Sequence, residues 1–149
     1  MDHADIMNSC DAKCRRSGLA SLTAVEKTVV LTSSVNFEVE MGGLSTFFYN
    51  SAGDHAAETV IALEGIGATY AAAALRSAIA RFPGGSAPAD RELRYASWQI
   101  ISGSLGSLDL GFARDTPDVF SRLCSFIDAH AADLQEHGAD AQAPPNCRF

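Results

Sequence analysis

The sequence predicts a single all-α domain of about six or seven helices. Helix-capping residues precede several runs whose apolar positions recur every three or four residues, and glycine or proline groups end these runs. A chain of 149 residues, 47% hydrophobic and 19% charged, is long and apolar enough to bury one core. We expect this domain to cover residues 19–137, with flexible segments at 1–18 and 138–149.

The first predicted helix follows a capping box formed by Thr23 and Glu26, in which each side chain accepts a hydrogen bond from the other residue's backbone amide. The pair Gly42-Gly43 is expected to end it. Between residues 35 and 41, however, apolar and polar residues alternate, which is the period of a strand. The residues alone therefore leave this stretch open between helix and strand.

Two further helices are predicted between residues 54 and 82. Asp54 can cap the first, which ends at the glycines after Glu64. The second, over 69–82, is rich in alanine and ends at Pro83-Gly84-Gly85. Its small side chains permit close approach of another helix, which, with the apolar excess, is consistent with a homodimer.

Three further elements are predicted. The first is a helix with Asp90 as its N-cap, and the second is a short one between Gly106 and Gly111. The third is a helix that begins at Thr116-Pro117, where proline takes the first helical position. The last of these carries a regular apolar stripe: Phe120, Leu123, Cys124, Ile127, Ala131 and Leu134. Trp98 and the phenylalanines are expected in the core.

The formal net charge is −7, and its distribution is uneven. Residues 17–75 hold six acids against one base, and residues 109–140 hold seven against two; an arginine-bearing segment lies between these blocks. With only Lys13 and Lys27 as lysines, direct nucleic-acid binding is not expected. No long apolar window and no signal peptide occur, so we expect a cytoplasmic protein with reduced cysteines and no membrane association.

The sequence predicts no metal site, cofactor or catalytic residue. Cys10 and Cys14 would face one way on a helix, but a zinc site needs four ligands, and only distant Cys147 or a histidine could complete it. Cys124 is expected to behave as a small hydrophobic residue. An alternative left open is a small-molecule or metal-dependent enzyme with a site in the polar turn Asn50, Asp54 and His55, although turn and cap chemistry explains the same residues.

Six short strings, taken in order, resemble the bacterial DNA-mimic protein family. They lie within residues 20–135 and are Met41–Leu44, Phe47–Asp54, Ile66–Ala68, Phe82–Gly85, Asp90–Arg94 and Leu108–Asp109. The resemblance implies a small, acidic, all-helical fold, which assigns helix to residues 24–41. It also implies a non-enzymatic protein whose carboxylates replace DNA phosphates on the DNA-binding face of a partner, typically a transcriptional regulator.

This resemblance directs attention to the acids, because carboxylates on rigid helices attract the lysines and arginines of a basic partner. The candidate partner-binding face comprises Glu38, Glu40, Glu58, Glu64, Asp109, Asp115, Asp118, Asp128 and Asp133. An immunity-type or scaffold protein that binds one basic partner through the same acids is an alternative that the sequence does not separate from a DNA mimic.

Overall fold

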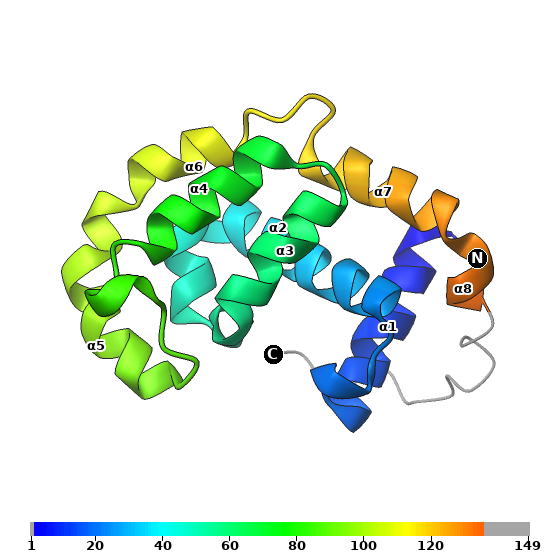
Figure 1. Ribbon diagram of the computed structural model, residues 1–149, viewed down its shortest axis with the longest axis horizontal. Helices are drawn as coiled ribbons and strands as arrows, with labels where there is room; N and C mark the ends of the chain where they lie inside the picture. The colour runs from blue at the N-terminus through cyan, green and yellow to red at the C-terminus, as the bar shows by residue number, and fades with distance from the viewer. Residues whose placement is uncertain (1, 136–149) are drawn as a thin grey trace.

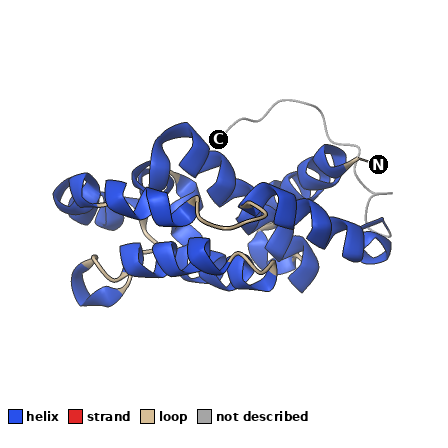
Figure 2. Cartoon of the chain, turned by 90° about the horizontal axis from the view of Figure 1, so that it is seen from above, coloured by secondary structure: helices blue, strands red, loops and turns tan. Residues whose placement is uncertain are grey.

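The computed structural model describes residues 2–135 as one helical domain with no strand among them (Figure 1). Its helices are α1 (His3–Ser17), α2 (Ala24–Tyr49), α3 (Ala56–Gly65), α4 (Thr69–Ile79), α5 (Arg91–Ile101), α6 (Gly106–Phe112), α7 (Val119–Ala129) and α8 (Ala131–Gln135). Short loops and 3₁₀ turns join them (Figure 2). The predicted all-α class is confirmed. The predicted tail at 138–149 lies outside the described residues.

The first helix corrects the expectation of a flexible segment over 1–18. Helix α1 buries Ile6 and Cys10 against the core. Nζ of Lys13 donates to both carboxylate oxygens of the buried Glu26, at 3.0 and 2.9 Å. Two buried side chains on one helical face and an ion pair to α2 therefore hold this segment in place. Both anchors depend on a neighbouring helix that the local sequence does not reveal.

Helix α2 begins at the predicted capping box. Oγ1 of Thr23 accepts from the backbone N–H of Glu26 at 3.2 Å, and the Glu26 carboxylate accepts from the N–H of Thr23 at 2.8 Å. The helix continues through residues 35–41, so the strand alternative is wrong. At Gly42 and Gly43 the backbone leaves the helical region, with φ +80° at Gly43, and the helix resumes after this kink.

The alanine-rich helix α4 is packed inside the domain. It contacts α3 and α6, and its inward residues are fully or almost fully buried: Ala71, Ala72, Ala74, Leu75 and Ala78. On α6, a Cβ placed on Gly111 would lie 3.4 Å from Cβ of Ala74. The close approach that the alanines permit is thus used between helices of one chain, and this helix gives no support to a homodimer.

Helix α7 begins later than predicted. Oδ1 of Asp118 accepts from the N–H of Ser121 at 2.8 Å and caps the helix, so the prediction of Thr116 as its N-cap is wrong. Leu123 and Ile127 are buried as the stripe predicts, but Phe120 is 48% exposed. Among residues 2–135, no helix combines the length and apolar character needed to cross a membrane.

Candidate partner-binding surface

A buried arginine, Arg94, joins α5 to the end of α2. Its guanidinium donates five hydrogen bonds of 2.7–3.1 Å, whose acceptors are the carbonyl oxygens of Phe48, Asn50, Pro88 and Ala89 and Oδ1 of Asp54. A Cβ on Gly53 would lie 2.9 Å from Nε of Arg94, so glycine makes room for the guanidinium. A buried charge is tolerated when its donors are satisfied in this way. This network therefore has a structural role.

The polar turn predicted as an alternative site is largely committed to this network. Asp54 does not cap α3, as the sequence suggested, but pairs with Arg94 from the 3₁₀ turn Ser51–His55. Asn50 donates from Nδ2 to Oε2 of Glu38 at 2.9 Å. These side chains tie the halves of α2 to each other and to α5.

Asp109, one of the predicted acids, acts as a cap for the second half of α2. Its Oδ1 accepts from the backbone N–H of Leu44 at 2.8 Å. A Cβ on Gly43 would lie 2.4 Å from Oδ2 of the same carboxylate, so the glycine at the kink leaves the space that Asp109 fills. The carboxylate thus bonds inside the domain, across 65 residues of sequence.

Asp115 is also a cap and is buried, with 5% exposure. It accepts from the backbone N–H groups of Tyr70 and Ala71, at 3.2 and 2.8 Å, in the first turn of α4. Ala68 occupies the N-cap position of α4 and has no side-chain acceptor, so Asp115 supplies one from elsewhere in the chain. The prediction that Asp115 lies on an exposed face is therefore wrong.

The four candidate glutamates on α2 and α3 occupy separate positions, each beside a polar or basic neighbour. Glu38 is half-buried beside Asn50, whereas exposed Glu40, Glu58 and Glu64 lie beside Asn36, His55 and Arg76 respectively. The last is an ion pair between α3 and α4, so the charge of Glu64 is largely compensated within the domain.

Exposed acids from both ends of the described chain come together where α1 begins and α7 ends. Nε2 of His3 lies 2.7 Å from Oδ1 of Asp128. We call this region the acidic end and define it by the exposed residues Asp2, Asp5, Asp128 and Asp133. Helix α1 contacts α7, and α8, which carries Asp133, contacts α7 as well. Acids of the second sequence block therefore lie beside the start of α1.

Asp118 lies at the opposite end of α7 from Asp128. Its carboxylate caps the helix but is exposed to solvent. Hydrogen bonds from the backbone N–H and then the side chain of Ser121 lower the pKa of Asp118 below its ordinary value. The residue is thus a carboxylate fixed by the helix start and still accessible to a partner.

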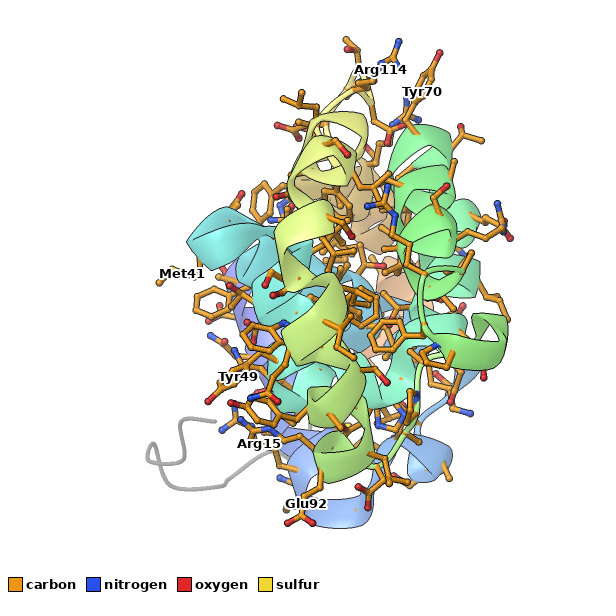
Figure 3. The ribbon with its side chains drawn as sticks, turned by 90° about the vertical axis from the view of Figure 1, so that its left-hand side faces the viewer. Arg15, Met41, Tyr49, Tyr70, Glu92 and Arg114 are labelled. Atoms are coloured by element: carbon orange, nitrogen blue, oxygen red, sulfur yellow. The ribbon has the colours of Figure 1, made fainter. Side chains whose placement is uncertain are left out.

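An exposed aromatic surface is the main feature that the sequence did not predict. We call it the aromatic face and define it by Phe37, Met41, Tyr49, Tyr95 and Trp98, from α2 and α5. The rings of Tyr49, Tyr95 and Trp98 have centroids 5.1–5.7 Å apart. Met41 and Tyr49 protrude on one side of the molecule (Figure 3). Trp98 is half-buried and packs against the core, as expected in part, with its ring also in contact with the exposed Tyr49 and Tyr95; the signal was the Tyr95–Trp98 spacing of three.

The three described cysteines lack the character of reactive thiolates. Burial, followed by the charge of Glu26, raises the pKa of Cys10 to about 11. Burial is also the main cause that raises the pKa values of Cys14 and Cys124. Within residues 2–135, no three His, Cys, Asp or Glu side chains are grouped so that they could hold a metal ion. Cys147, considered as a fourth ligand, lies outside these residues.

Comparison with known proteins identifies one family. A family model described as DMP19-like protein matches residues 20–130, which contain α2 through α7, the Arg94 network and the caps supplied by Asp109 and Asp115. No curated protein and no solved structure gave a significant match.

Proposed function

The chain belongs to the DMP19-like protein family, and from this premise we propose that it is a non-enzymatic DNA mimic. In this proposal it occupies the DNA-binding surface of a basic protein, typically a transcriptional regulator. The observation that carries the proposal is the family match over residues 20–130. A net charge of −7 and an isoelectric point near 4.9 support it, because both oppose direct contact with DNA and favour a basic protein.

The proposed contacts are the acids that remain accessible in the fold. From the predicted face we retain Glu38, Glu40, Glu58, Glu64, Asp118, Asp128 and Asp133 and add the exposed Asp2 and Asp5 of the acidic end. Asp109 and Asp115 are left out because their carboxylates cap helices from a half-buried and a buried position, whereas Asp118 caps α7 from an exposed one. The strongest candidates are the exposed acids at the two ends of α7, Asp118 and Asp128.

Helix α7 gives these two carboxylates a fixed separation. Asp118 precedes the first residue of α7 and Asp128 lies in its last turn, so ten residues separate them, a rise of about 15 Å along the helix axis. The backbone N–H of Ser121 holds Asp118, so little rotamer freedom is lost when a partner binds it. Attraction between such carboxylates and a partner's arginines and lysines speeds association and weakens as salt screens it over about 8 Å at physiological ionic strength.

The alternatives have less support. An immunity-type or scaffold protein would use the same acids on a different basic partner, so the partner's identity separates it from a mimic. An enzyme centred on Asn50, Asp54 and His55 is disfavoured because the first two side chains bond within the fold. We also propose a cytoplasmic location, in keeping with the free thiols of Cys10, Cys14 and Cys124.

The proposal is tested by capture of binding proteins from a host lysate on the immobilised full chain, at about 0.1 M and about 0.5 M salt. We expect a DNA-binding protein that is retained at low salt and released by duplex DNA. The double variant Glu58→Gln/Asp128→Asn should retain less of it. A matched control, Glu64→Gln/Asp11→Asn, removes the same charge from residues paired with Arg76 and Arg15 and should retain more. Capture of a nuclease toxin instead would favour the immunity alternative.

A further inference from the structure

The aromatic face exposes more apolar surface than its helices need for their own packing. Phe37, Met41, Tyr49 and Tyr95 are 60%, 68%, 42% and 41% exposed, although α2 and α5 already contact each other. Exposed apolar side chains grouped on neighbouring helices mark interaction sites in soluble proteins. Mutual contact of the rings also fixes their orientation before any partner arrives, which lowers the entropic cost of binding.

The chemical groups on this face indicate which kind of side chain a partner would place there. Nε1 of Trp98 donates to the carbonyl oxygen of Ser45 at 2.8 Å, so the indole has no free donor to offer. The rings of Tyr95 and Trp98 are stacked, with an angle of 15° between their planes. The face therefore offers the π surface of its aromatic rings, the hydroxyl groups of Tyr49 and Tyr95 and the apolar side chain of Met41. Such a surface attracts cations that carry a flat, weakly hydrated group.

Charges around the aromatic face favour the same kind of partner. Glu40 lies one helical turn from Phe37, Glu92 lies one turn from Tyr95, and both are exposed. Glu38 reaches the face through its hydrogen bond to Asn50, the neighbour of Tyr49. These carboxylates therefore lie on the same two helices as the rings, and a basic partner could pair with the exposed Glu40 and Glu92 while its side chains cover the apolar surface.

One arginine of the protein, Arg91, already lies against a ring of the aromatic face. Arg91 places Cζ 5.3 Å from the centroid of the Tyr49 ring and donates from Nε to the Tyr49 carbonyl oxygen at 2.9 Å. Its stacking leaves Tyr49 42% exposed, so the rest of the aromatic face remains open. A second copy of this chain is a poorer occupant, because it would bring an equally acidic border against Glu40 and Glu92.

We propose that the aromatic face is a docking site for arginine side chains of a basic protein partner. Guanidinium groups would stack on Tyr95 and Trp98 and pair with the bordering glutamates. That the partner is a basic protein rests on the proposed function. The consequence is a binding mode that combines salt-sensitive pairing with stacking contacts that persist at high salt, where attraction through carboxylates alone would fade.

The test uses the only tryptophan of the chain, Trp98, as a fluorescent reporter of its own face. The full chain is titrated with deca-arginine and, separately, with deca-lysine, at about 0.1 M and about 0.5 M salt. We expect deca-arginine to change the Trp98 emission and to bind roughly two- to fivefold more tightly than deca-lysine, with the preference persisting at the higher salt.

Matched variants identify the surface responsible. Tyr95→Ala should abolish the arginine preference, as should Met41→Ser, which alters a side chain 68% exposed and leaves the fold intact. Tyr70→Ala is the control: Tyr70 is 54% exposed and carries Arg114 at 5.2 Å from its ring, but lies on α4, away from this face (Figure 3). It should keep the preference.

Three results would overturn the inference. The first is equal affinity for the two peptides with unchanged Trp98 emission. The second is a shift of Trp98 emission with protein concentration alone, accompanied by dimer formation in sedimentation velocity, because a second copy would then cover the face. The third is retention of a DNA-binding protein from lysate by Tyr95→Ala as strongly as by the wild type. That last result would leave the proposed DNA mimicry standing while removing this docking site.

Discussion

Arg94 and Asp54 form the ion pair that fixes the turn after α2 to α5, with 2.8 Å between Nη2 and Oδ1. The arginine is fully buried, whereas the Asp54 side chain is 35% exposed. The two partners therefore have unequal importance: Asp54 is one of five acceptors, but Arg94 is the donor for all of them.

Replacing Arg94 should strongly destabilise the fold. Arg94→Ala leaves four carbonyl oxygens and one carboxylate without their donor, and we expect a loss of about 3–5 kcal/mol in the free energy of unfolding, measured by urea denaturation. Asp54→Asn, which keeps an acceptor oxygen at a partly exposed position, should cost less. If Arg94→Ala cost no more than exposed Arg76→Ala, the network would not have the structural role assigned to it.

The kink in α2 should depend on Gly43. An alanine there needs φ near +80° and places Cβ 2.4 Å from Oδ2 of Asp109, so the carboxylate must move and its hydrogen bond to Leu44 is lost. We expect Gly43→Ala to lower the free energy of unfolding by about 2 kcal/mol. Gly106→Ala is the control, because nothing lies within 4 Å of its Cβ and it starts α6. Equal effects of the two changes would contradict this account.

Asp115 should contribute to stability rather than to partner binding. Asp115→Ala removes both side-chain acceptors from the first turn of α4 and should cost about 1–2 kcal/mol in thermal or urea unfolding. Once the lower stability is allowed for, capture of the partner should be unchanged. A variant of full stability with reduced capture would place Asp115 on the binding surface after all.

Most helices could be predicted because their signals are local. The capping box at Thr23 and the N-cap at Asp90 lie next to the helices they start, and the structure confirms both. Helix α1 gives a weak signal, because Ile6 and Cys10 are its only fully buried residues. Its anchors lie on other helices: Lys13 pairs with Glu26 on α2, the next α-helix, and His3 contacts Asp128 on α7, 125 residues along the chain.

The candidate site was harder to predict because a carboxylate can either lie on the surface for a partner or cap a helix inside the fold. Asp109 and Asp115 look like surface acids in the sequence, yet each caps a helix far along the chain. A usable clue was that Ala68 precedes α4 without a side chain able to cap it, which requires an acceptor from elsewhere. The aromatic face was not predicted because large aromatic residues are usually buried, so the sequence favoured core positions for them.

Cys10 should make stability depend on alkaline pH. Because its pKa rises from the ordinary 9.0 to about 11 in the folded state, its stabilising contribution is complete below pH 9.0 and is lost as pH increases toward 11. For one proton, the loss approaches about 1.4 kcal/mol per pH unit. The free energy of unfolding, measured across this pH range, should fall less steeply for Cys10→Ala than for the wild type. Parallel pH profiles would show that Cys10 does not carry the effect.

The central claim is that this protein takes the place of DNA on a basic partner. It is tested most directly by fluorescence polarisation of a labelled duplex bound to the protein captured from lysate, titrated with the full chain. We predict that the polarisation falls to the value of free DNA as the chain is added, and that Glu58→Gln/Asp128→Asn requires a higher concentration. A constant or rising polarisation, which means that DNA and the chain bind together, would contradict the account.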